Sequence, residues 1–182
     1  MRTLTDLHAR IFDPIARAEG LLPLLARFVF AAVLVMYFWV SGLTKLGDGP
    51  LFGLLQPALG AYAQIFPRAM EAASYDVTQL GLWHYLVVLA GTVAEFVLPA
   101  LIVLGLATRL AALGMIGFIV VQSLTDIVGH GATDVETLGR WFDRLPDGVI
   151  LDQRALWVLL LMILVVKGGG WLSFDRALAP RR

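Results

Sequence analysis

Four long apolar stretches constrain the fold of this chain more than any other feature of its sequence. They cover residues 24–46, 82–106, 110–128 and 155–172, and the mean hydropathy of the chain is +0.80. A helix of about 20 apolar residues crosses the hydrocarbon core of a bilayer and satisfies its own backbone hydrogen bonds there. The sequence therefore predicts an all-α integral membrane protein, built as a bundle of four spanning helices.

The basic residues near the ends of these stretches predict the orientation of the bundle. Most of the 14 Lys and Arg residues fall on the side that holds both ends of the chain, among them Arg27, Arg109 and Lys167. Basic residues in short loops stay in the cytoplasm during membrane insertion. We therefore expect the N-terminus and the C-terminus in the cytoplasm.

Residues 1–22 carry apolar side chains at helical spacing and precede the predicted membrane domain of residues 23–178. Asp13 followed by Pro14 is typical of an N-cap and the first helical position. We expect this segment to form an amphipathic helix that lies in the cytoplasmic membrane interface.

Both outer loops also contain amphipathic patterns. Leu51, Leu55, Leu59, Tyr62 and Phe66 predict a short surface helix in the first outer loop. In the second outer loop, the pattern predicts a short amphipathic turn, and Asp152 is an expected cap of the fourth span. The residues of this turn are Leu138, Trp141, Phe142 and Leu145. Packing over the mouth of the bundle explains these segments more simply than docking of a partner does, and both interpretations stay open.

The composition excludes several classes of chemistry. The chain has no cysteine, which rules out disulfides, thiolate metal sites, iron–sulfur clusters and thioether-bound haem within it. Its three dispersed histidines predict no metal site. Because the formal net charge is zero, no general field attracts nucleic acid. We expect no covalently bound cofactor and no nucleic-acid partner, with the lipid bilayer as the surroundings of the chain.

Glu95 is the most informative polar residue within the predicted spans. It lies about 13 residues from the outer end of its span, which places it roughly 20 Å deep and past the midplane. Pro99, four residues later, leaves the Glu95 carbonyl without its helical partner, so we expect a kink there. Burial favours the neutral carboxyl unless water or a basic group reaches it. Glu95 is then a candidate for proton exchange, and the alternative is a protonated carboxyl bonded to a neighbouring helix.

Further polar residues are expected to line a vestibule on the outer side of Glu95. They are Tyr37, Ser41 and Lys45 on the first span, His84 on the second, and Gln122, Asp126 and His130 on the third. Within the first and third spans these residues follow four-residue steps and share one helical face. We expect Lys45 and Asp126 to pair if their spans are adjacent. Snorkelling of Lys45 and interhelical bonding of Gln122 and Asp126 are the alternatives. For Arg109 and Lys167, an orientation signal with lipid headgroup contact is the favoured interpretation.

Four local motifs together resemble the DoxX family of small four-helix membrane proteins, over residues 24–178. They are SGLTKL at 41–46, AE at 94–95, GLATRLAA at 105–112 and GGGWLSFD at 168–175. The resemblance implies a four-helix bundle in the bacterial inner membrane. Five residues match positions of the family motifs, namely Lys45, Glu95, Arg109, Ser173 and Asp175.

The resemblance also implies a link to membrane redox systems, because the family includes the small subunits of thiosulfate:quinone oxidoreductase. Other members accompany superoxide-handling or sulfur-transfer proteins, or are encoded beside metal-stress or peptide-maturation genes. The outer loop at 129–152 is similar to that last group. A protein partner is therefore expected, either a redox subunit or a periplasmic or membrane complex.

Three functions follow as hypotheses. In the first, the chain is a small subunit or accessory of a quinone-linked redox system, in which Glu95 exchanges a proton with the quinone while Tyr37, His84 or Lys45 orients its oxygens. The second is a non-enzymatic membrane scaffold in stress or peptide-maturation systems. The third, a small proton-coupled transporter, ranks last because the sequence has no inverted repeat. The sequence leaves open the substrate, whether the chain is itself catalytic, and whether it forms a homo-oligomer.

Overall fold

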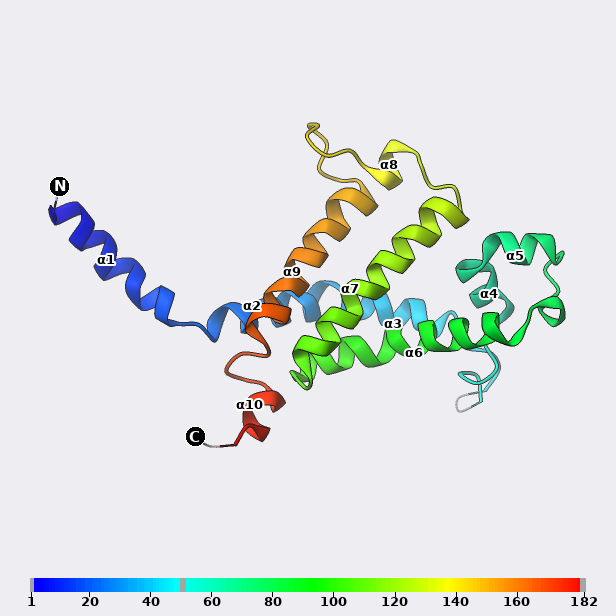
Figure 1. Cartoon of the computed structure of the whole chain (residues 1–182), viewed down its shortest axis with the longest axis horizontal. Coiled ribbons are helices and arrows are strands. Elements are labelled where there is room, and N and C mark those ends of the chain that lie inside the picture. Colours follow the sequence, from blue (N-terminus) through cyan, green and yellow to red (C-terminus); the bar gives the residue numbers. More distant parts are fainter. Residues whose placement is uncertain (1, 50–51, 181–182) are drawn as a thin grey trace.

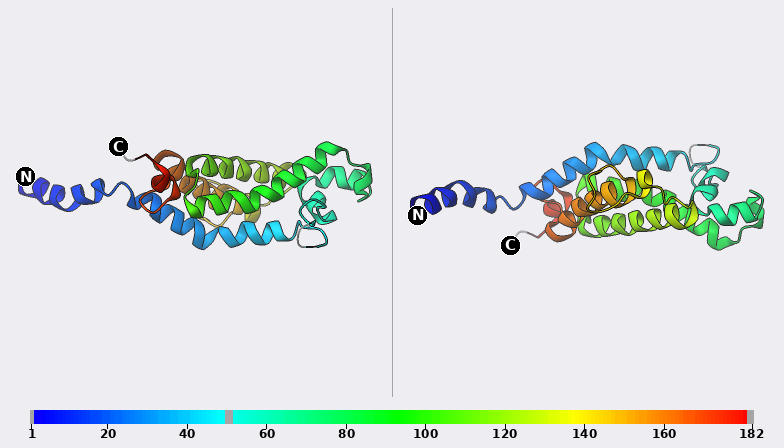
Figure 2. Two further views of the ribbon diagram at one scale, coloured as in Figure 1. Left: turned by 90° about the horizontal axis from the view of Figure 1, so that it is seen from below. Right: turned by 90° about the horizontal axis from the view of Figure 1, so that it is seen from above.

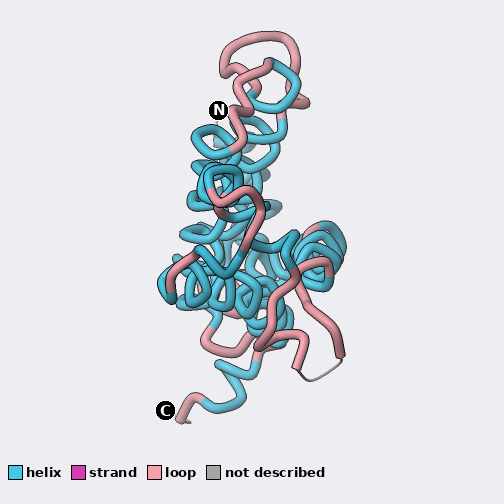
Figure 3. Tube along the Cα trace, turned by 90° about the vertical axis from the view of Figure 1, so that its right-hand side faces the viewer, coloured by secondary structure: helices cyan, strands magenta, loops and turns pink. Residues whose placement is uncertain are grey.

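The computed structural model describes residues 2–49 and 52–180, and all regular elements in these ranges are helical (Figures 1 and 3). By length and composition, three helical segments can each cross a membrane, namely Leu82–Leu104, Thr108–Gly129 and Val149–Lys167. A fourth span consists of α2 (Leu21–Val33) and α3 (Val35–Leu43), which meet at a bend of 40°. The predicted all-α membrane bundle is confirmed, and the break at Leu34 is a feature that the sequence pattern did not predict.

The remaining spans differ from the predicted ranges mainly at their ends. The second is α6 (Leu82–Leu104), which continues through Pro99 as one helix. The third is α7 (Thr108–Leu124) with a π-helical turn at Thr125–Gly129. The fourth is a π-helical turn at Val149–Gln153 followed by α9 (Arg154–Lys167). It ends at Lys167 rather than at residue 172, because Gly168 takes a left-handed φ of 78° and turns the chain.

The spans pack as a closed ring around one hydrophobic core. α7 contacts both α6 and α9, α2 contacts α6 and α9, and α3 contacts α6. Figure 1 shows α7 and α9 inclined to α3 and α6, with the two pairs approaching each other near the α6–α7 turn. Large side chains from each span fill the core, including Phe30, Phe38, Ile102, Met115 and Leu161.

Residues after the fourth span join the first span to the α6–α7 turn. α10 (Phe174–Leu178) begins at Ser173, whose hydroxyl accepts a hydrogen bond from the Arg176 N–H at 3.2 Å. Asp175 accepts hydrogen bonds from the N–H groups of Ala107 (2.6 Å) and Thr108 (2.8 Å), and its own N–H donates to the Gly105 carbonyl. A side chain at Gly105 would collide with Ser173, so this close approach requires glycine.

Arg27 lies at the centre of this junction and is only 7% exposed. Its Nε donates to the Ile102 carbonyl and its Nη1 to the Gly169 carbonyl, both at 2.9 Å. It also donates to the carbonyls of Val103 and Leu172. The Ile102 and Val103 carbonyls lie in the last turn of α6, and those of Gly169 and Leu172 lie in the chain after α9. One guanidinium thereby joins α2, α6 and the chain after α9.

The helix α1 (Arg2–Arg17) extends away from the bundle, at the end that also holds the C-terminus (Figure 2). Its apolar side chains Leu7, Ile11 and Ile15 are each more than half exposed, so this face has no cover from the described bundle. The helix begins at Arg2 and passes through Pro14, so the expected N-cap at Asp13 is wrong. Interfacial placement of the segment at residues 1–22, as a domain apart from residues 23–178, stays a prediction.

In the loop between the first and second spans, α4 (Leu59–Ile65) and α5 (Pro67–Ala72) replace the single surface helix that the spacing predicted, and a short 3₁₀ helix follows at Val77–Gln79. Leu55 lies before α4, and Leu51 lies outside the described residues. Buried Tyr62 and Met70 pack α4 and α5 against Val88 of α6. This loop therefore covers the first turns of α6.

In the loop between the third and fourth spans, α8 (Val135–Leu138) ends before Gly139, and a turn at residues 141–142 leaves Trp141 and Leu145 exposed rather than on one helical face. Asp152 lies within the π-helical turn and accepts the Gly148 N–H at 2.9 Å. It therefore holds the residue before that turn and is not an N-cap of the span.

We predict that Arg27→Gln lowers the free energy of unfolding by about 3 kcal/mol, because it removes charged hydrogen bonds and leaves buried carbonyls without donors. Thermal unfolding of the detergent-solubilised chain measures the change. Arg10→Gln on exposed α1 removes the same charge and should leave the unfolding midpoint unchanged. Equal midpoints for the Arg27 variant and the original chain would contradict the proposed junction.

Candidate functional site

Lys45 and Glu95 form a buried ion pair between the first and second spans. Lys45 is 4% exposed and Glu95 is 2% exposed. The Lys45 Nζ lies 2.9 Å from both carboxylate oxygens of Glu95. Ser41 completes the group: its hydroxyl donates to Glu95 Oε1 at 2.9 Å and accepts from Lys45 Nζ at 2.8 Å. A basic group of the first span thus reaches Glu95 on the second span.

The local sequence explains why the two spans meet at this level. A Cβ on Gly42 would lie 2.8 Å from the Phe96 ring, so the missing side chain lets α3 approach α6 closely. Lys45 follows the end of α3 and stands four residues after Ser41, on the same helical face. The close approach of α3 to α6 then brings both side chains to Glu95.

A cavity of about 380 Å³ opens beside the ion pair, between α3, α6 and α7, with Gln64 and Ile65 of α4 at its edge. Small residues on α6 and α7 leave this space, namely Gly91, Ala94, Gly114 and Gly117. Most of the wall is apolar, and the polar groups on it come from Ser41, Lys45, Gln64, Glu95, Gln122, Thr125 and Asp126. The cavity thus combines an apolar wall with a small number of convergent polar groups.

Asp126 pairs with Arg154 and not with Lys45. The Arg154 Nη2 lies 2.7 Å from Asp126 Oδ2, and its Nη1 donates to the Ser123 hydroxyl at 2.9 Å. Arg154 is the first residue of α9, which packs beside α7, whereas Lys45 reaches Glu95 on α6. No expectation drawn from the sequence assigned a partner to Arg154. Its position at the very start of an apolar stretch was the signal that it needs an acidic partner.

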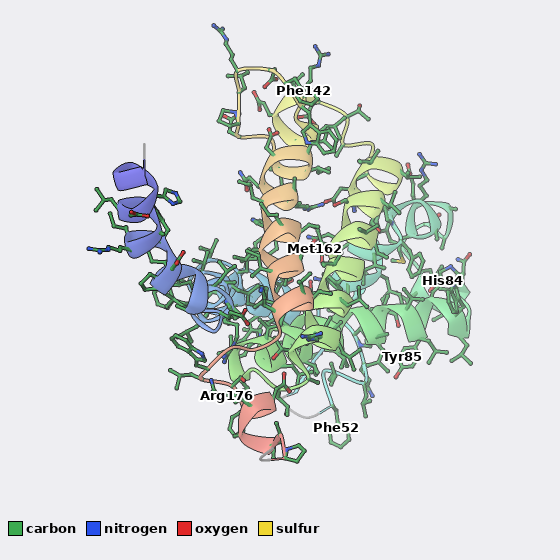
Figure 4. All side chains as sticks on the ribbon, turned by 60° about the vertical axis from the view of Figure 1, so that its left-hand side comes forward. Phe52, His84, Tyr85, Phe142, Met162 and Arg176 are labelled. Carbon is green, nitrogen blue, oxygen red and sulfur yellow. The ribbon has the colours of Figure 1, made fainter. Side chains whose placement is uncertain are left out.

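The other expected vestibule residues divide between the cavity and its surroundings. Gln122 lines the cavity and donates from Nε2 to the Tyr37 hydroxyl at 2.9 Å, while Tyr37 itself stands outside the lining and packs on Trp157. His84 lies at the start of α6 with its ring against Phe66 (Figure 4). Its Nδ1 is buried and finds no hydrogen-bond partner among the described residues.

His130 also lies outside the cavity lining, and its Nε2 is 2.9 Å from the Gln64 carbonyl. It joins the end of the third span to α4. Neither this histidine nor any other described residue belongs to a group of three or more His, Cys, Asp or Glu that could hold a metal ion.

The residues expected at the opposite end of the bundle have separate surroundings. Ser173 caps α10, and Asp175 binds the first N–H groups of α7. Arg109 and Lys167 are exposed and line a different depression, which α7, α10 and the glycines after α9 surround. These residues therefore take no part in the cavity beside Glu95.

We predict that Lys45→Met destabilises the chain by about 3–5 kcal/mol, because it leaves a buried carboxylate without its partner. Lys45→Met combined with Glu95→Leu should recover most of this loss, since apolar replacement of a whole buried pair is often neutral. Unfolding of the single and double variants in mixed micelles gives the coupling energy. Additive losses in the double variant would show that the two charges do not interact.

A family model described as DoxX matches residues 22–125 of the chain. The matched range covers more than half of the 182 residues and includes Ser41, Lys45, Glu95 and the glycines of the cavity wall. The comparison with curated proteins and the comparison with solved structures gave no match. The chain has the apolar helices of a membrane protein, and the family match shows that it belongs to the DoxX family of membrane proteins.

Proposed function

We propose that this chain is a membrane subunit of a quinone-linked redox system and that Glu95 exchanges protons with a quinone bound in the cavity. The observation that carries the proposal is the buried Lys45–Glu95 pair on the wall of a mainly apolar cavity within the membrane bundle. Ionisable groups within a membrane span are costly and most often serve transport, proton transfer or ligand binding. A pair that only joined two helices would not need an open space beside it.

The size and lining of the cavity suit an amphiphilic ring compound. Ligand sites in proteins commonly measure about 300–1,000 Å³ and combine apolar walls with a few placed polar groups. The cavity of about 380 Å³ has this character. Lys45 and Ser41 supply donors for a carbonyl oxygen, and the Oε1 of Gln122 is a buried acceptor without a hydrogen-bond partner among the described residues. A hydroxyl of a reduced ring would provide the missing donor.

The hydrogen-bonded group can move a proton between the cavity and the protein. The Ser41 hydroxyl contacts Glu95, so a proton that Glu95 takes up from the aqueous side can pass through Ser41 to an oxygen of the ligand, and Glu95 returns to the carboxylate that Lys45 binds. Asp126 lines the same cavity with a side chain that is 30% exposed, and it offers a path toward the outer surface. Reduction of a quinone to a quinol consumes two electrons and two protons. The electrons come from a partner or directly from the substrate, because the chain has no cysteine for a cluster.

Gly117→Leu should fill the cavity and lower quinone affinity at least about tenfold, a loss of about 1.4 kcal/mol. Nothing lies within 4 Å of a Cβ at Gly117, so the added side chain enters open space without a backbone clash. Gly60→Leu, at an exposed position of α4 outside the cavity lining, makes the same chemical change, and a Cβ there also meets nothing within 4 Å. Equilibrium binding of a short-chain quinone to the purified variants measures both. Equal affinities in the two variants would exclude the cavity as the site.

Glu95→Gln should retain quinone binding but lower quinone reduction in native membranes by at least about a hundredfold, the usual contribution of a positioned proton-transfer group. Glu71→Gln, an exposed residue of α5 outside the cavity, is the matched control. Activity that survives in the Glu95 variant would remove proton exchange from the proposal.

An accessory protein without enzymatic activity is the second candidate, and one observation favours it. Phe142 stands fully exposed at the tip of the second outer loop, with a left-handed φ of 65° (Figure 4). An aromatic side chain presented in this way suits contact with a protein partner. In that case, changes at Trp141 or Phe142 would abolish function while Glu95→Gln would preserve it, which is the opposite of the redox prediction.

A further inference from the structure

Both termini lie at one end of the bundle (Figure 2). That end carries a depression of about 590 Å³, separate from the cavity beside Glu95. Three basic side chains line it, one each from α7, α9 and α10: Arg109, Lys167 and Arg176. All three are exposed, and none of them makes a side-chain hydrogen bond or an ion pair within residues 2–49 and 52–180. Helices from three parts of the chain thus bring together three cations that no described acid neutralises.

Two acidic residues lie at the same depression and leave the balance positive. Glu19 is exposed. Burial raises the pKa of Asp175, but hydrogen bonds from Thr108 and Ala107 and the charge of Arg27 outweigh this and keep the pKa below its ordinary value. The carboxylate of Asp175 is therefore ionised and already bound by N–H groups. It does not compete for the three exposed cations.

A second depression of about 590 Å³ adjoins the first and shares Trp171, Ser173 and Arg176 with it. Its wall is mainly apolar, with Leu104, Leu172 and Phe174 all about half exposed or more. The ring of Trp171, which follows α9, packs against Gly20, which precedes α2. Tryptophan side chains favour the level of the lipid headgroups. A cationic surface is thereby continuous with an apolar one at the membrane boundary.

We propose that these two adjoining depressions bind an anionic phospholipid, with its phosphate against Arg109, Lys167 and Arg176 and an acyl chain along Leu104, Leu172 and Phe174. A phosphate alone would use only the cationic half. The apolar half, joined to it through Trp171 and Arg176, is what selects a lipid over a soluble phosphate. Basic pockets between membrane helices are known to bind the headgroups of anionic lipids. The site requires no quinone and stands independently of the function proposed above.

The test compares phosphatidylglycerol, phosphatidylcholine and inorganic phosphate as ligands of the detergent-solubilised full chain, with bound lipid measured by native mass spectrometry. The original chain should bind phosphatidylglycerol more tightly than phosphatidylcholine. The triple variant Arg109→Gln, Lys167→Gln and Arg176→Gln should lose about a hundredfold in phosphatidylglycerol affinity, at about fivefold for each cation near a membrane surface. The control variant Arg68→Gln, Arg140→Gln and Arg144→Gln removes three exposed cations elsewhere and should bind normally.

Further arms separate the sources of phosphate and guard against misfolding. Leu172→Ala with Phe174→Ala should weaken phosphatidylglycerol binding and leave binding of inorganic phosphate unchanged. Thermal unfolding in phosphatidylcholine micelles checks that the triple variant folds; if it does not, Arg176→Gln alone should still lower affinity about fivefold. Equal binding of both lipids, or full displacement of phosphatidylglycerol by inorganic phosphate with no effect of the apolar variant, would overturn the proposal.

Discussion

In hydrocarbon, a polar group without a partner inside the protein costs several kcal/mol, and this constraint decides where the charges of the bundle lie. Lys45 and Glu95 satisfy it as a pair with Ser41. Arg154 satisfies it through its two terminal nitrogens, with Asp126 and Ser123, while its buried Nε has no hydrogen-bond partner among the described residues. Arg27 has no acidic contact within hydrogen-bond distance among the described side chains, and it satisfies the constraint with backbone carbonyls in the last turn of α6 and after α9. Each solution joins elements far apart in sequence, so the charges also hold the spans together.

Glycine residues decide where neighbouring elements of the bundle come into direct contact and where a space is left between them. At Gly42 and Gly105 the missing side chain brings elements into direct contact, against Phe96 and Ser173 respectively. At Gly117 nothing fills the room that the missing side chain leaves, and the result is part of the cavity beside Glu95. The same residue type therefore closes the bundle at one level and opens it at another. What differs is whether a large side chain stands opposite.

Apolar length alone predicted where the spans lie, because lipid imposes the same requirement on every spanning helix. The partners of the charges were not predictable in this way. Whether Lys45 meets Glu95 or Asp126 depends on which spans are neighbours and how each is rotated, and neither property is visible in one sequence. Arg27 was interpreted only as an orientation signal, since its acceptors are backbone carbonyls that no residue type marks. At Pro14 and Asp152 the residue type suggested a helix start, and the wider apolar pattern prevailed.

The four carbonyls that accept hydrogen bonds from Arg27 are synthesised at different times. Ribosomal synthesis delivers α2 to the membrane long before Gly169 and Leu172 exist, so two of the four carbonyls that surround this guanidinium arrive only behind the fourth span. Until then the Arg27 guanidinium on the first span has at most two of its four carbonyl acceptors. The ring of helices consequently closes late in biogenesis. An insertion intermediate with three spans would hold its first span more loosely than the finished protein does.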